Sequence, residues 1–186
     1  MTFYAVILFL HIVSAMGIFV GLGLEWAATA GLRKADGAAE FRVSIGMLRS
    51  VPMLFGFSSV IVLLTGGYLA SKIGRAGLSW IVPSLVTLVV LGALGGGLSG
   101  RRLRRIREVH LEGAGPVPIG LRTLVRDPLL VASLRVRLAL ALGIVYLMAA
   151  KPLLAPSLVV LGCAAIAGLI FSARSFRRPR NLGMEA

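Results

Sequence analysis

Residues 1–24 read MTFYAVILFLHIVSAMGIFVGLGL and contain no charged side chain. Residues 51–71, 76–100 and 152–173 are also free of charge. A helix of roughly 20 residues spans the ~30 Å hydrocarbon core of a bilayer, so each stretch is long enough to cross a membrane. This pattern predicts a membrane protein and not a water-soluble domain.

A further span is indicated by Asp127-Pro128, because Asp is a good N-cap and Pro is favoured at the first helical position. The helix 128–150 then carries Arg135 and Arg137 in its first three turns, from which long side chains reach the headgroups. The sequence thus predicts an all-α membrane protein, a single domain with a five-transmembrane-helix bundle. The predicted spans are residues 3–30, 50–71, 77–101, 128–150 and 153–173, with a basic connection at 101–127 and a basic tail at 174–186.

Positive charge is concentrated on one side of these spans. Of the 20 Lys and Arg residues, only Lys72, Arg75 and Lys151 fall on the other side. Because loops rich in Lys and Arg stay in the cytoplasm, we expect the N-terminus outside and the C-terminus cytoplasmic, in a bacterial inner membrane. The net charge of +13 is then a topology signal, and we expect no nucleic-acid partner.

Composition and motifs argue against soluble-enzyme chemistry. The hydrophobic content is 58%, and the single Cys163 leaves no intramolecular disulfide and no Cys-rich metal site. The sequence contains no P-loop, dinucleotide fingerprint or metalloprotease helix motif. We therefore expect no bound metal, and enzymatic activity is not indicated.

Small residues recur at helix-packing intervals. Gly92, Gly96 and Gly100 form a GxxxGxxxG row, and Gly17 and Gly21 repeat the spacing in the first span. In lipid, such rows let helix backbones approach closely. The neighbour is an internal helix, a second copy or another membrane protein. In an alternative interpretation, the glycines make room for a flat macrocycle.

An Arg cluster follows the third span and is expected to extend that helix into the cytoplasm. Such a cluster marks the end of a span and contacts anionic lipid headgroups, at about 1 kcal/mol per residue near the surface. It consists of Arg101, Arg102, Arg104, Arg105 and Arg107.

His11 is the ionisable residue deepest in the first span. A helical period places it on one face with Ser14, Ile18, Leu22 and Glu25, and this face is expected to point into the bundle. A neutral imidazole in a membrane ligates haem iron, relays a proton or hydrogen-bonds a neighbour. Because one strong axial ligand suffices for haem b, His11 is a candidate haem ligand.

Glu25 is the second candidate on the first span. Arg135 and Arg137 lie at a similar depth in the fourth span, and Arg49 opens the second. Residues two apart on a helix face roughly 200° apart, so at most one of the fourth-span arginines meets Glu25. An ion pair with one of these three arginines is the expected arrangement, and a proton-carrier role is the alternative.

Several stretches together resemble the CopD-like superfamily of small bacterial membrane proteins, and most closely its uncharacterised "predicted integral membrane protein" family. The resemblance covers roughly residues 3–152 and implies a compact helical bundle. Relatives include copper-import proteins and a haem-binding membrane oxidase of protoporphyrinogen, in which a first-helix His is a haem ligand; only His11 matches that role. The matching stretches are Phe9-Leu10-His11-Ile12-Val13-Ser14-Ala15, Leu64-Thr65-Gly66-Gly67, Trp80, the Arg-rich connection, and Val145-Tyr146-Leu147-Met148 with Lys151-Pro152.

Two function classes follow. We favour a non-enzymatic protein, a permease-like bundle or an assembly and interaction bundle, since most features have a structural explanation. The alternative is a haem b-binding protein that uses His11 for electron transfer or for redox chemistry of a porphyrin or quinone. A visible spectrum distinguishes the two classes.

Overall fold

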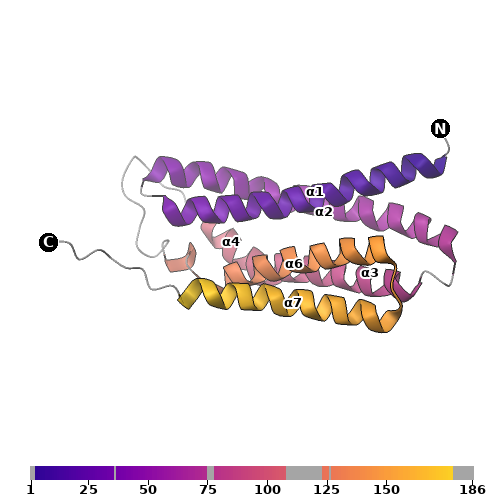
Figure 1. The fold of residues 1–186 in the computed structure, drawn as a ribbon. Helices are drawn as coiled ribbons and strands as arrows, with labels where there is room; N and C mark the ends of the chain where they lie inside the picture. Colours follow the sequence, from indigo (N-terminus) through magenta and orange to yellow (C-terminus); the bar gives the residue numbers. More distant parts are fainter. Residues whose placement is uncertain (1–2, 36, 75–77, 108–122, 126, 178–186) are drawn as a thin grey trace.

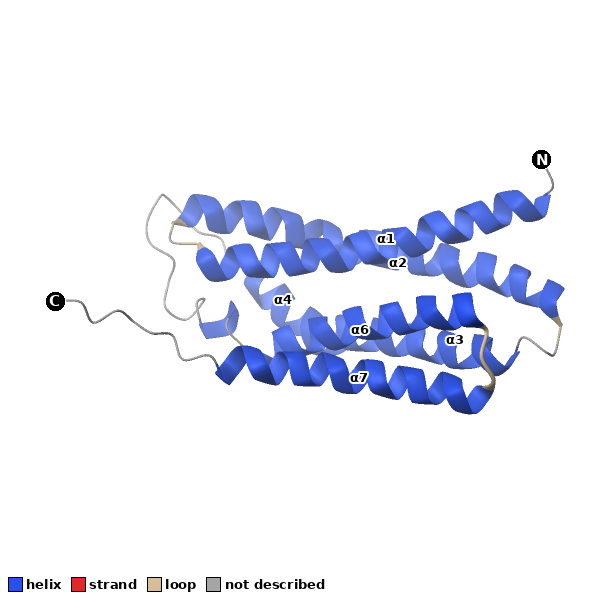
Figure 2. Ribbon diagram, in the orientation of Figure 1, coloured by secondary structure: helices blue, strands red, loops and turns tan. Residues whose placement is uncertain are grey.

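The computed structural model describes residues 3–35, 37–74, 78–107, 123–125 and 127–177, and every regular element in these ranges is a helix. Among the described residues, five helical stretches are long and apolar enough to cross a membrane, which confirms the predicted five-helix bundle. Figure 2 shows this all-helical architecture. The elements are α1 (Phe3–Lys34), α2 (Ala38–Ile73), α3 (Leu78–Ala93), η2 (Leu94–Ser99), α4 (Gly100–Arg107), α6 (Pro128–Ala150) and α7 (Leu154–Arg177).

The helices form two antiparallel pairs joined by a central helix. α1 and α2 lie side by side along their lengths, α6 and α7 form the second pair, and α3 packs against α6 (Figure 1). The start of α1 and the end of α7 lie at opposite ends of the bundle, as five crossings require. Two small-residue contacts bring α1 and α2 together: a Cβ on Gly17 or Gly31 would lie only 2.3 or 2.5 Å from the hydroxyl oxygen of Ser58 or Ser44.

The second helix differs from its predicted range. It begins at Ala38, ahead of the predicted span of residues 50–71, so Arg42 and Arg49 both lie on the helix. Phe41, Ile45 and Leu48 recur at helical spacing and are buried, which makes this extension amphipathic. At 1.5 Å per residue the 36-residue helix is about 54 Å long. It therefore extends well beyond the ~30 Å hydrocarbon core.

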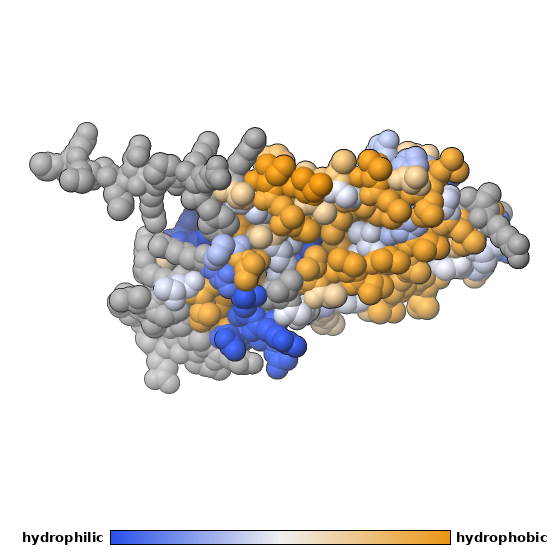
Figure 3. Space-filling view, turned by 90° about the horizontal axis from the view of Figure 1, so that it is seen from below, coloured by the Kyte–Doolittle hydropathy of each residue, from blue (hydrophilic) through white to orange (hydrophobic). Residues whose placement is uncertain are grey.

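The core has two parts. One lies in the middle of the bundle, and the other lies at the end formed by the helix extensions, where α4 and the start of α6 meet the α1–α2 turn. On the face shown in Figure 3, apolar residues cover much of the described surface, and hydrophilic residues gather toward the end of the bundle where α7 ends. The central cluster includes Ile18, Leu22, Val62, Leu91, Leu134, Leu140, Ala141, Ile144, Leu147 and Leu161. The second cluster includes Ala28, Leu32, Ala35, Phe41, Ile45, Leu48, Leu103, Ile106, Val125 and Leu130.

Helix boundaries follow local sequence. Asp127 caps α6, since its Oδ1 accepts a hydrogen bond from the Leu129 amide at 2.9 Å, and Pro128 opens the helix as predicted. Lys151 ends α6 in the left-handed conformation. The third span continues through η2 into α4. This confirms the prediction that the Arg cluster continues the helix of that span. Most of the predicted connection (108–122) and the end of the tail (178–186) lie outside the described residues.

Candidate functional site

One face of α1 carries Glu25 into the bundle. Ser14, Ile18, Leu22 and Thr29 are buried with it, at the three- and four-residue spacing of a single helix face. This confirms the predicted orientation of the stripe. The glutamate therefore lies among apolar side chains, where a carboxylate requires a partner.

Arg137 of α6 is that partner. Its Nη2 donates to Glu25 Oε1 in an ion pair, and each residue is only 2% exposed. The other two candidates do not take this place: Arg135 donates to the Phe171 carbonyl of α7, and Arg49 is exposed on α2. The ion pair thus joins α1 to α6 across the bundle.

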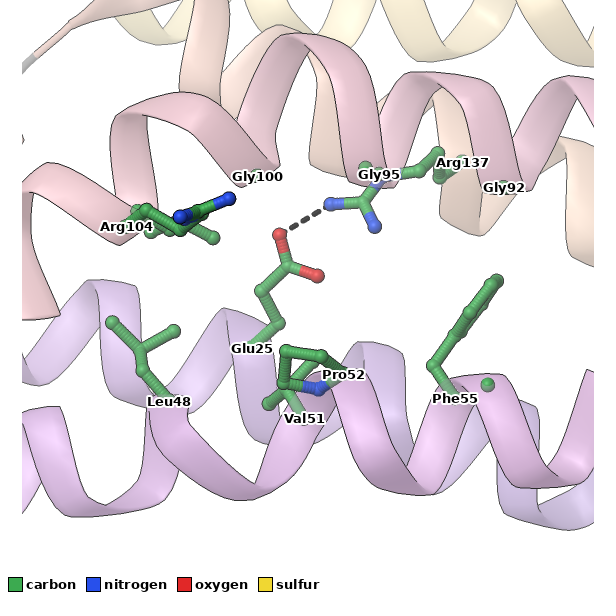
Figure 4. Close-up of a pocket in the computed structure, with 13 residues that line it drawn as sticks. Glu25, Leu48, Val51, Pro52, Phe55, Gly92, Gly95, Gly100, Arg104 and Arg137 are labelled. Carbon is green, nitrogen blue, oxygen red and sulfur yellow. Dashed lines mark hydrogen bonds and ion pairs between the residues drawn. The ribbon is translucent and has the colours of Figure 1, made fainter.

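A cavity of about 300 Å³ lies beside this ion pair. Figure 4 shows α1 and α2 on one side of the cavity and the α3–η2–α4 helix on the other, with Arg137 reaching in from α6. Leu48, Val51 and Phe55 form apolar walls. The complete lining is Glu25, Leu48, Val51, Pro52, Phe55, Gly56, Gly92, Gly95, Gly96, Gly100, Leu103, Arg104 and Arg137.

Glycines keep this cavity open. A Cβ on Gly92 or Gly96 would have no heavy atom within 4 Å. Among the described residues, these two glycines therefore do not make the close helix contact expected of the GxxxGxxxG row. At Gly100, the nearest atom to a Cβ would be the Gly95 carbonyl oxygen of the preceding turn. Gly17 does make the expected close contact, and Gly21 makes an ordinary one with Phe55.

The helix wall opposite Glu25 is locally π-helical, from Leu94 to Ser99. Three consecutive glycines, 95–97, weaken the regular α-helical geometry here, and π-helical turns often occur at functional sites. A Cβ on Gly95 would lie 2.7 Å from Arg137 Nη1, so glycine at this position gives the guanidinium its space. A hydrogen bond of 3.0 Å from Ser99 to Ser133 fastens the segment to α6.

The cavity reaches the surface between α2 and η2. Glu25, Arg137 and Val51 are buried, whereas Pro52 and Gly96 are exposed. Gly56 and Arg104 are also exposed lining residues, with Arg104 on the α4 side (Figure 4).

The ion pair does not use all the hydrogen-bonding atoms of Glu25 and Arg137. The contact joins one carboxylate oxygen to one guanidinium nitrogen, and Figure 4 shows the other oxygen and another nitrogen directed away from it. Arg137 Nε is buried and has no hydrogen-bond partner in the described part of the chain. A guanidinium and a carboxylate can together hold a ligand that accepts a hydrogen bond from the guanidinium and donates one to the carboxylate.

His11 forms a separate site. The Thr65 hydroxyl donates to the Ile61 carbonyl at 2.6 Å, so its oxygen accepts from His11 Nδ1 at 2.9 Å. A Cβ on Gly66 would lie 3.1 Å from the imidazole Cε1, which places the ring against α2. His11 does not line the cavity, because it precedes Glu25 by about 21 Å along α1.

These contacts fit haem only in part. A hydrogen bond from Nδ1 orients many ligand histidines, but the cavity described above lies elsewhere. His11 is the only histidine that the described ranges contain, and no second axial ligand is evident there. Within the same ranges, no three His, Cys, Asp or Glu side chains gather as a metal site.

The arginines of α4 differ in their contacts. Arg102 forms an ion pair with Asp127, which ties α4 to the start of α6. Arg101 and Arg105 are exposed on α4, as is Arg104 at the edge of the cavity, and Arg107 ends the helix. Their basic face is suited to anionic headgroups.

In comparisons with known proteins, no family model, no curated protein and no solved structure matches this chain. The cavity and its ion pair therefore supply the functional argument.

Proposed function

We propose that this chain is a non-enzymatic, permease-like protein of a bacterial cytoplasmic membrane, oriented with its N-terminus outside. The observation that carries the proposal is the cavity of about 300 Å³ beside the buried ion pair of Glu25 and Arg137. Ionisable residues inside a membrane are costly, and they commonly mark pathways for ions and solutes. The resemblance to the CopD-like superfamily agrees with a compact bundle of this kind.

A purely structural ion pair is the competing explanation. Such a pair is best stabilised by complete hydrogen bonding in a closely packed interior. Here Gly92 and Gly96 leave space beside it, and both charged residues line that space. Space together with polar groups is typical of a binding site.

The site lies closer to one membrane face. Glu25 is nine residues before the end of α1 at Lys34, about 14 Å along the helix. Arg104 and the other α4 arginines lie on the same side. By the positive-inside rule this is the cytoplasmic side, so the proposed site opens toward the inner leaflet.

The experiment is a shrinkage and swelling assay in proteoliposomes. Vesicles with and without the protein are mixed with a concentrated solution of glycerol, glycine, choline chloride or ammonium methanesulfonate, and light scattering follows volume recovery. Ammonia crosses the bilayer unaided and binds any proton that enters with the anion, so the ammonium salt can accumulate. A permease accelerates recovery for at least one of these solutes. An assembly protein leaves all four rates equal to those of empty vesicles, and that result would overturn the proposal.

A matched pair of variants tests whether the cavity is the pathway. Gly92→Leu fills the cavity, whereas Gly162→Leu adds the same side chain to the exposed face of α7, where a Cβ also has no atom within 4 Å. We expect loss of solute flux in the first variant and normal flux in the second. Equal flux in both variants would place the pathway elsewhere.

The haem alternative is tested on the same preparation. An oxidised and a dithionite-reduced visible spectrum, recorded after expression in haem-replete cells, is expected to lack a Soret band. A Soret band that His11→Ala removes would establish haem binding and favour the redox function.

A further inference from the structure

We propose that the cavity binds a small monoanion on Arg137 and that Glu25 takes up one proton when the anion displaces it, so that anion and proton cross together. This inference rests on the proposed permease function and specifies its substrate class and coupling. Its basis is that Arg137 is the buried cation of the cavity and Glu25 is its sole hydrogen-bonded partner among the described residues.

Displacement is geometrically simple. One carboxylate oxygen of Glu25 contacts one guanidinium nitrogen, and the cavity adjoins both groups (Figure 4). A guanidinium offers five N–H donors and binds carboxylate, sulfonate or phosphate oxygens in a fork geometry. A monoanion in the cavity therefore competes with Glu25 for the same donors.

A proton must then join Glu25. An isolated carboxylate in an apolar interior is so unfavourable that it becomes neutral. The exchange is balanced: the anion, a proton and the Glu25–Arg137 pair become an anion–Arg137 pair and a neutral Glu25. Net charge in the site is the same before and after, so the loaded site moves no net charge.

Few other charged groups line the cavity around Glu25 and Arg137. α6 contributes Arg137, and α4 contributes Arg104 at the exposed edge. The α2 wall consists of Leu48, Val51, Pro52, Phe55 and Gly56, and the described part of η2 contributes only glycines to the lining. Among the lining residues, Glu25 is thus the only carboxylate that can accept the proton.

The cavity also restricts the kind of anion. Arg104 places a second positive charge at the edge, which favours negatively charged solutes. The walls are apolar, and a volume of about 300 Å³ is at the lower end of small-molecule sites. We infer a small organic monoanion, with its charged group on Arg137 and its apolar part against Val51 and Phe55.

The test uses proteoliposomes of the full chain that contain a pH-sensitive dye. The probe is sodium methanesulfonate, a strong-acid anion that does not cross the bilayer as a neutral acid. With potassium and valinomycin clamping the membrane potential at zero, an inward methanesulfonate gradient is expected to acidify the lumen. The fall in lumen pH should follow methanesulfonate uptake. Sodium sulfate, whose anion carries two charges, should not acidify the lumen.

The membrane potential gives an independent readout on the wild-type protein. An unpaired monoanion would change its accumulation about tenfold for each ~60 mV of imposed potential. Paired with a proton, methanesulfonate is expected to accumulate equally at every potential. A tenfold dependence, or uptake without acidification, would overturn the coupling while the permease function stands. Absence of uptake for every solute would instead overturn the permease function.

Two variants assign the roles. Glu25→Gln is expected to retain methanesulfonate uptake but to lose acidification and gain dependence on potential. Arg137→Gln is expected to lose both uptake and acidification, while Arg49→Gln, on the exposed face of α2, retains both. Acidification that persists in Glu25→Gln would overturn the assignment. If Glu25→Gln fails to fold, the wild-type measurements at different potentials decide the coupling.

Discussion

At the scale of single residues, loss of either partner of the Glu25–Arg137 ion pair is expected to lower the free energy of unfolding. Removing one partner leaves an unpaired buried charge, so Glu25→Gln or Arg137→Met should each destabilise the protein by about 3 kcal/mol. The double variant Glu25→Leu with Arg137→Met should cost much less than the sum, because no charge is left unpaired. Denaturation in mixed micelles measures all three.

The matched control is Arg49→Gln, which changes an exposed residue and should alter stability by no more than about 0.5 kcal/mol. Strictly additive losses in the double variant would contradict direct coupling between Glu25 and Arg137. Unchanged stability in the Glu25 variant would contradict a stabilising ion pair altogether.

The sequence predicts an ion pair of Glu25 but not which arginine is its partner. Helical spacing placed Glu25 on the inward face of α1 and limited its partner to one of Arg135 and Arg137, or to Arg49. The choice depends on how α6 is rotated about its axis, which tertiary packing decides and the local sequence does not. The contact between Gly95 and Arg137 was not predicted either, because it joins residues on different helices.

At the scale of helices, α6 and α7 are held by a backbone contact at Gly168. A Cβ there would lie 2.7 Å from the Val136 Cα and 3.1 Å from the Arg135 carbonyl oxygen. Backbone atoms cannot rotate aside as a side chain can, so Gly168→Ala should separate the helices and destabilise the protein by about 1–3 kcal/mol. Thermal unfolding in detergent provides the measurement.

Gly162→Ala on the same helix is the control, since a Cβ at Gly162 has open space. This change should be neutral or slightly stabilising, because Ala has the higher helix propensity. An equal change in stability in both variants would contradict a specific packing role for Gly168.

Helix ends were predicted where the local chemistry is strong. Asp127-Pro128 fixed the start of α6, since a cap and a constrained backbone act over two residues. The predicted second span begins at residue 50, where the uncharged stretch starts, so it leaves out the first turns of α2, in which Phe41 and Ile45 are buried. The π-helical segment at Leu94–Ser99 was also missed. Its glycines permit several backbone geometries, and contact with α6 selects one.

At the scale of the whole molecule, hydrophobic length alone predicted five helices, because the bilayer requires satisfied backbone hydrogen bonds over ~30 Å. The cavity had no comparable signal. It arises where the α1–α2 pair meets the α3–η2–α4 helix (Figure 4), and the same glycines are equally compatible with close packing. Space between helices is a property of the assembled bundle.

The final prediction concerns orientation in the membrane. In a Cys163→Ser background, Arg42→Cys at the basic end and Ser71→Cys near the opposite end of α2 are treated with a membrane-impermeant maleimide. We expect labelling of Ser71→Cys in intact cells and of Arg42→Cys only after permeabilisation, because Lys and Arg near span ends are retained in the cytoplasm. Both positions are exposed and lie on the same helix, so each controls for expression of the other. Labelling of Arg42→Cys in intact cells would invert the topology. The proposed cavity would then open toward the outer leaflet, and the direction from which an anion reaches Arg137 would be reversed.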